Sequence, residues 1–165
     1  MPPTAISPSI RRLVSLLDWY SGEPMTRWSG SSSDLDAFQT TVGGILPTLF
    51  AQLALNYRWN EASCEWIALL PNPTSEGLTG LAQSVQQDNA LHEVLRGHGL
   101  LQFGRPANGR YDPVCFATDQ TTGGDCPVLR IDHERILQHR EVKVVEVLAP
   151  SFSALVDTIL ADDPA

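Results

Sequence analysis

The apolar residues of this chain change their spacing near residue 100. Before that point they recur at intervals of three and four, as in Ile10, Leu13, Val14 and Leu17, which is the period of an amphipathic helix. After it the intervals are mainly two, which is the period of a β-strand. Helices therefore gather in the N-terminal half and strands in the C-terminal half, which one helix closes. This order predicts an α+β fold rather than alternating β-α-β units.

The expected helices share an apolar stripe and a recognisable start or stop residue. They cover 9–20, 33–42, a segment from Pro47 through Tyr57, 78–85, a short segment after Asp88, and a final segment after Ser151. The expected strands cover 64–70, 101–105, 110–118, 127–132 and 142–148. Asn108-Gly109 predicts a tight hairpin between the second and third of them. The last strand has almost no polar face, which predicts a strand covered on both sides.

The chain carries a net charge of −8, from 19 Asp and Glu against 11 Lys and Arg. A surface that binds nucleic acid needs clustered cations for the phosphates, so direct nucleic-acid binding is not expected. The acidic balance favours a basic protein partner instead. No stretch reaches the length needed to span a membrane, so no membrane partner is expected. A length of 165 residues fits one domain, 1–165.

The cysteines and histidines do not form a metal-binding pattern. Cys64, Cys115 and Cys126 contain no Cys-x-x-Cys pair, and their odd number favours reduced thiols and a cytoplasmic location. The four histidines lack the short paired spacing that presents two ligands to zinc. We therefore expect no metal and no other cofactor.

Cys115 and His133 are the pair that could serve as a thiol nucleophile and its base. Cys115 occupies an inward-facing position in an apolar run, where cysteine behaves as a small hydrophobic residue, so a structural role is favoured. Asp132, His133 and Glu134 are adjacent, so their side chains do not converge on one substrate, and we expect a solvated turn there. The sequence therefore predicts no catalytic residue, and a thiol hydrolase using Cys115 and His133 remains the alternative of another class.

Four tryptophans are more than the core of a chain this size requires, and tryptophan is enriched at binding surfaces. We expect Trp19 and Trp66 in the core. Trp28 lies in a Gly- and Ser-rich loop, and Trp59 lies between Arg58 and Asn60, so these two are expected to be partly exposed.

Several segments carry a family resemblance: Phe103-Gly-Arg-Pro106, Tyr111-Asp-Pro-Val-Cys-Phe116, Asp125 through Glu134, and Ser151-Phe152 before the last helix. Together with the helix start at Leu46-Pro47, they resemble the SUKH superfamily, which includes bacterial immunity proteins and relatives of a fungal cell-wall-synthesis regulator. The resemblance spans 46–160. It implies a central antiparallel or mixed sheet flanked by helices, no catalytic residues, and activity through binding. The immunity branch neutralises toxins delivered between bacteria, many of which are nucleases.

The expected function is therefore non-enzymatic protein binding, as an immunity protein that neutralises a cognate toxin such as a basic nuclease. A regulatory scaffold that binds the cell's own proteins is the alternative within the same class. The sequence leaves the oligomeric state open. The candidate contact residues, chosen for loop placement, aromatic character or charge, are Trp28, Asp34, Asp36, Trp59, Glu61 and Glu65.

Overall fold

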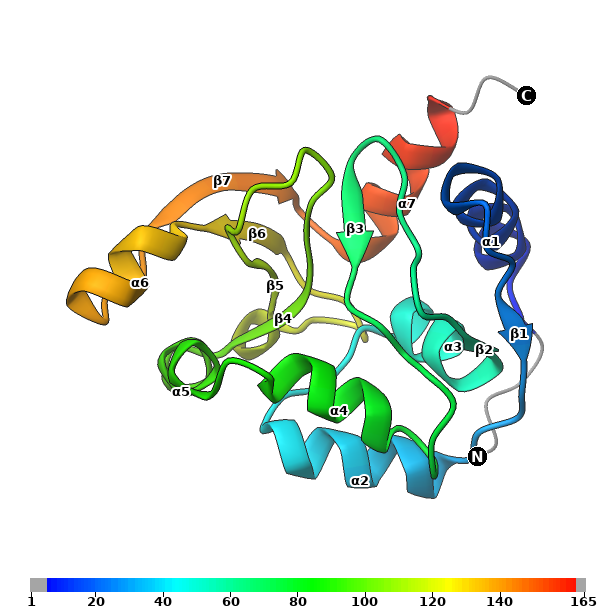
Figure 1. Cartoon of the computed structure of the whole chain (residues 1–165), viewed down its shortest axis with the longest axis horizontal. Coiled ribbons are helices and arrows are strands. Elements are labelled where there is room, and N and C mark those ends of the chain that lie inside the picture. Colours follow the sequence, from blue (N-terminus) through cyan, green and yellow to red (C-terminus); the bar gives the residue numbers. More distant parts are fainter. Residues whose placement is uncertain (1–5, 163–165) are drawn as a thin grey trace.

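The computed structural model describes residues 6–162 and confirms the α+β class (Figure 1). Seven α-helices, a five-stranded antiparallel sheet and a two-stranded sheet lie within this range. In chain order the elements are α1 (Pro8–Ser21), β1 (Thr26–Arg27), α2 (Ser32–Val42), α3 (Thr48–Asn56), β2 (Tyr57–Arg58), β3 (Ile67–Leu69), α4 (Thr79–Gln86), α5 (Asn89–Gly97), β4 (Leu100–Pro106), β5 (Val114–Ala117), a 3₁₀ turn (Thr118–Gln120), β6 (Val128–Ile131), α6 (His133–His139), β7 (Val144–Ala149) and α7 (Phe152–Ala161).

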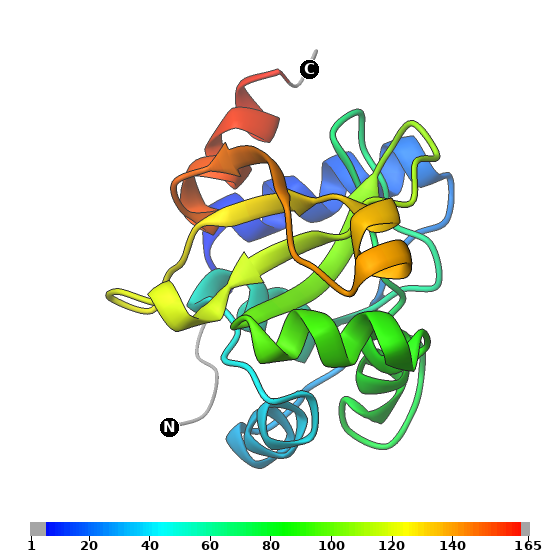
Figure 2. The ribbon, with the colours of Figure 1, turned by 90° about the vertical axis from the view of Figure 1, so that its left-hand side faces the viewer.

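The main sheet is a meander in which each strand pairs with the next one along the chain, in the order β3-β4-β5-β6-β7 (Figure 2). Side chains alternate between its faces, as they do in any strand. Val114 and Phe116 of β5 join the large apolar cluster that includes α1, α3 and α7. Cys115 and Ala117 join the smaller cluster with α5 and α6. Helices therefore cover the centre of the sheet on both faces.

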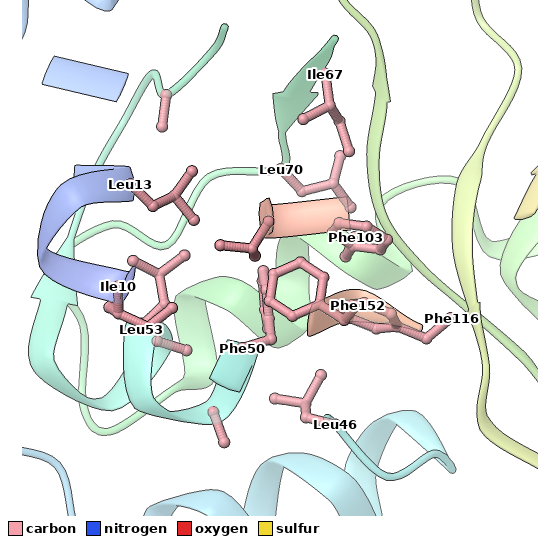
Figure 3. Close-up of a cluster of buried hydrophobic side chains, with 14 of the residues drawn as sticks. Ile10, Leu13, Leu46, Phe50, Leu53, Ile67, Leu70, Phe103, Phe116 and Phe152 are labelled. Carbon is pink, nitrogen blue, oxygen red and sulfur yellow. The ribbon is translucent and has the colours of Figure 1, made fainter. Parts of the chain in front are cut away.

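Four phenylalanines form the centre of the larger cluster (Figure 3). Phe103 and Phe116, from neighbouring strands, stack with their ring centroids 3.8 Å apart. Phe50 of α3 and Phe152 of α7 meet the Phe116 ring edge to face, at 5.2 and 5.4 Å. These rings join two helices to two strands that lie far apart in the sequence, so this contact holds the two halves of the chain together.

Side-chain caps set the starts of several helices. Asp88 accepts a hydrogen bond from the Leu91 N–H, and Ser151 accepts one from the Ala154 N–H, as the sequence predicts. The helix expected over 33–42 begins one residue earlier, at Ser32, with Ser31 as its N-cap. Ser31 and Asp34 form a capping box there, in which each side chain accepts from the other residue's backbone N–H.

Strand β7 corrects one expectation. The predicted strand is present, but it lies at the edge of the sheet, and four of its six residues are exposed. The expectation that this continuous apolar run is covered on both faces is therefore wrong. An apolar run of this length shows β-propensity, whereas coverage depends on which helices lie above the strand.

Three other expectations also need correction. The solvated turn at Asp132-His133-Glu134 is the start of α6, with Asp132 as its N-cap. The hairpin between β4 and β5 is longer than expected, although Gly109 has the positive φ of 83° that the Asn-Gly turn requires. Tyr57, expected in a helix, ends α3 and begins β2, which pairs with β1.

Candidate protein-interaction surface

The six predicted contact residues do not form one surface. Asp34 and Asp36 belong to α2, at the bottom of Figure 1, whereas Glu61 and Glu65 belong to the segment between β2 and β3, which reaches the top. Asp34 is half-buried and engaged in the capping box, although it borders a hollow of about 340 Å³ between α2 and α4. Asp36, Glu61 and Glu65 are exposed. Two separate acidic regions are therefore available, on opposite sides of the molecule.

Trp59 is buried, contrary to expectation. Only 3% of its surface is exposed, and its indole Nε1–H donates to the Leu70 carbonyl at 2.9 Å. Its backbone also exchanges hydrogen bonds with Asn72, at 3.0 Å in each direction. Trp59 therefore holds the start of the β2–β3 segment in place and cannot reach a partner in this conformation.

Trp28 is half-buried and also has a structural contact. Its Nε1–H donates to the Ala54 carbonyl at 3.0 Å, and the Arg58 guanidinium lies 3.5 Å from the centre of its ring. Arg58 itself donates to the carbonyls of Ser75 and Gly77, which fixes the segment before α4. Burial lowers the pKa of Arg58, although the nearby Asp34 acts in the opposite direction.

The tryptophans expected in the core are the exposed ones. Trp19 is 69% exposed and Trp66 is 45% exposed, and Tyr20 beside Trp19 is 38% exposed. The expectation that Trp19 lies in the core is wrong because of its position around the axis of α1. Trp19 follows Ile10 by nine residues, about two and a half turns, so it lies opposite the buried stripe of α1. No comparable signal was available for Trp66, which lies in an irregular segment.

These aromatic residues come together where the end of α1 meets the β2–β3 segment. The rings of Trp19 and Tyr20 pack edge to face with centroids 4.9 Å apart. Tyr20 and Trp66 border a common small hollow with Glu65 and Asp162, the residue that follows α7. That hollow has a volume of about 10 Å³, which is too small for a small-molecule ligand. The exposed aromatic residues around this hollow are better placed to contact a protein surface than to enclose a small molecule.

Two hydrogen bonds fix the β2–β3 segment against α1. The Ser63 N–H donates to Ser21 Oγ at 2.9 Å, and Asn60 Nδ2 donates to Glu23 Oε1 at 3.1 Å. The turn is closed internally, since the Cys64 N–H donates to the Ile67 carbonyl at 3.0 Å. Because the segment is held before any partner arrives, binding would lose little conformational freedom there.

The three chain segments that meet here carry charges of one sign. Residues 13–26, 59–66 and 152–162 each contain two carboxylates and no Lys, Arg or His. We call the side chains exposed here the aromatic–acidic surface, and it consists of Trp19, Tyr20, Glu23, Glu61, Glu65 and Trp66. Aromatic anchors on segments that carry exposed carboxylates suit a partner that presents basic residues.

The thiol pair proposed for catalysis does not meet the requirements of a nucleophile. Cys115 is fully buried in the cluster between the sheet, α5 and α6, and burial raises the pKa of its thiol. A reactive cysteine needs the opposite shift. His133 lies at the start of α6, where its ring is near Tyr111 and its Nδ1 is 3.7 Å from Glu134.

Asp112 and Asp125, which lie in two of the segments that resemble SUKH proteins, have structural roles. Asp112 accepts from Arg130 Nη1 at 2.7 Å and from the His133 N–H at 3.0 Å, which joins the β4–β5 loop to β6 and α6. Asp125 accepts from the backbone N–H groups of Phe152 and Ser153 at the start of α7. These segments therefore stabilise the fold.

Within residues 6–162, no group of three or more His, Cys, Asp or Glu side chains is arranged to hold a metal ion. No helix in the same range has the length and apolar character needed to cross a membrane. Neither a family model nor a curated protein sequence matches this chain.

Proposed function

We propose that this chain is a non-enzymatic protein-binding domain that uses the aromatic–acidic surface to bind a basic protein. The observation that carries the proposal is the exposure of Trp19, Tyr20 and Trp66 on chain segments that carry carboxylates and no cations. Large aromatic side chains are costly to leave in water, and they supply most of the binding energy at many interfaces. Their partner would bury them under a surface that pairs its cations with Glu61 and Glu65.

The partner that we propose is a bacterial toxin, so that the chain acts as an immunity protein in the cytoplasm. The resemblance of the family-like segments to SUKH proteins supports this choice. A toxin that acts on nucleic acid carries cations that bind phosphate. An acidic surface with aromatic anchors is complementary to such a site, and it would speed association through long-range attraction.

Co-expression with the product of each gene that neighbours this chain's gene tests the proposal, because the cognate toxin should be one that arrests growth. Wild-type chain should restore growth, whereas the Trp19→Ala, Trp66→Ala double variant should fail to do so at equal protein levels. Tyr111→Ala is the matched control, because Tyr111 is a highly exposed aromatic residue outside the surface. Rescue by the double variant would refute the surface, and absence of rescue by wild type would refute the immunity role.

A charge variant tests whether the carboxylates of this surface speed association by long-range attraction. Glu65→Lys should slow association and weaken its dependence on salt, because it reduces the local attraction. Asp36→Lys changes an exposed carboxylate on the opposite side of the molecule and should change the association rate much less. Equal effects of the two charge changes would show that net charge, rather than this surface, controls binding.

A further inference from the structure

Strand β7 leaves one edge of the main sheet open. It is the last strand in the sheet order, and it pairs only with β6. Among residues 6–162, the backbone of 144–149 makes no hydrogen bond to any segment other than β6. An edge of this kind presents unpaired N–H and C=O groups, which are a template for another strand. Figure 1 shows β7 on the left of the molecule, away from α1 on the right.

The same strand exposes apolar side chains. Val144, Val145 and Val147 are 46%, 42% and 61% exposed, and Leu137 of the adjacent α6 is 52% exposed. Natural edge strands are commonly protected from pairing by charged residues, proline, β-bulges or a covering segment. The register of β7 against β6 shifts at two places, but its exposed residues are mainly valines, which favour strand pairing. The exposed edge and the exposed valines thus occur on one element.

The charges around β7 favour a second copy of the chain over a basic partner. Residues 130–146 contain four Lys or Arg and four Asp or Glu, so this region carries no net charge although the whole chain carries −8. A basic partner is therefore not attracted here as it is to the aromatic–acidic surface. Two copies of the chain, which repel each other elsewhere, can approach at this edge.

Two charged residues of opposite sign lie on this part of the chain. Lys143 precedes β7, and Glu146 lies near its middle, three residues later. In an antiparallel pair of identical strands with its axis near Val144 and Val145, Lys143 of each copy comes near Glu146 of the other. Opposite charges across such a pair stabilise it, and two-fold symmetry forms the contact twice.

We propose that residues 142–147, which include the first four residues of β7, pair antiparallel with the same residues of a second copy, so that the two five-stranded sheets become one continuous sheet across a two-fold axis. The exposed valines would then gain cross-strand neighbours from the second copy. This interface is separate from the aromatic–acidic surface, which would stay accessible on both copies.

Analytical ultracentrifugation of the full chain tests the proposal. The wild type should form a species of twice the 18.0 kDa chain mass, in a range from about 1 μM to about 1 mM where weak dimers form. Val147→Lys should remain a monomer under the same conditions, because it places two ammonium groups at the paired edge. Ile45→Lys is the matched control, since Ile45 is similarly exposed but lies between α2 and α3, and it should dimerise as the wild type does.

A charge exchange tests the antiparallel pairing itself. Lys143→Glu should weaken the dimer, because it places carboxylates opposite each other, and adding Glu146→Lys should restore it. The internal contact of Glu146 with Arg130 is 3.5 Å long, and Arg130 keeps its shorter bond to Asp112. A wild type that stays monomeric throughout the range overturns the proposal. So does a dimer that survives Val147→Lys, or one that only Trp66→Ala disrupts.

Discussion

Replacing Asp125 by asparagine should destabilise the protein through the start of α7. Oδ1 of Asp125 accepts from the N–H groups of Cys126 and Phe152, at 2.9 and 2.8 Å. Oδ2 accepts from the N–H of Ser153 at 3.2 Å and from its hydroxyl. The carboxylate therefore joins the segment before β6 to the first turn of the last helix, where negative charge is favourable.

The magnitude follows from what asparagine cannot do. Its amide has one acceptor oxygen, so whichever way it turns, an NH₂ group faces donors that now have no acceptor. A hydrogen bond to a charged group contributes roughly 1.5–3 kcal/mol, and such contributions are not additive, so we expect a loss of about 2–3 kcal/mol in the free energy of unfolding. This corresponds to a fall in Tm of about 4–12 °C for a chain of this size.

The effect should depend on pH. Burial acts to raise the pKa of Asp125, but hydrogen bonds from Ser153, Phe152 and Cys126 outweigh it, and the pKa lies below its ordinary value. A carboxyl group with a lowered folded-state pKa stabilises the protein above its unfolded pKa of about 4, and that stabilisation is lost as the pH falls through the folded value. The difference between wild type and Asp125→Asn should be full near neutral pH and shrink below about pH 4.

Urea denaturation at several pH values measures this difference. Asp157→Asn is the control, because Asp157 is an exposed carboxylate on the same helix, and it should change stability by less than about 0.5 kcal/mol. A loss below about 1 kcal/mol for Asp125→Asn, or a loss that is equal at pH 3 and pH 7, would refute the reasoning.

Three further predictions follow from the core. Phe116→Ala should lower the free energy of unfolding by about 3–5 kcal/mol in urea denaturation, because a fully buried ring with three aromatic neighbours is removed, and a loss below about 1 kcal/mol would contradict the packing. Thiol reagents should label Cys115 in the native protein only as fast as it unfolds, since its thiol is buried and its pKa raised; rapid labelling at neutral pH would favour the thiol hydrolase. His92→Leu should remove a loss of stability that sets in as the pH falls below about 6.5, because burial lowers the pKa of His92 and its Nε2 has no hydrogen-bond partner among the described residues. The exposed His139→Leu is the control, and equal pH profiles for wild type and His92→Leu would count against the last prediction.

The helices were the most predictable part of the fold, because their patterns are local. Ser151 and Asp88 cap the helices that the sequence assigns to them, and the apolar stripe of α1 is the buried one. The short helix α6 was missed because it has a single buried residue, Ile136, and therefore no apolar period to detect. Local signals predict helices well only where a stripe of several residues is buried.

The candidate site was less predictable, because exposure depends on tertiary packing. Trp59 and Trp66 both lie near the β2–β3 segment, yet one donates to a buried carbonyl and the other faces solvent. Nothing in the adjacent residues distinguishes these two environments. Charge and loop placement single out Glu61 and Glu65 in the sequence. The structure places Glu65 beside Tyr20 and Trp66, and Glu61 lies exposed on the same segment.

The affinity of the toxin for the Trp66→Ala variant, measured by calorimetry beside wild type and Tyr111→Ala, tests the central claim most directly. Because Trp66 is exposed, its replacement should leave the Tm nearly unchanged. If it is an anchor of the interface, the dissociation constant should rise about 30-fold or more, while Tyr111→Ala binds as tightly as wild type. An unchanged dissociation constant for a fully folded Trp66→Ala variant would contradict the claim that the aromatic–acidic surface binds the partner.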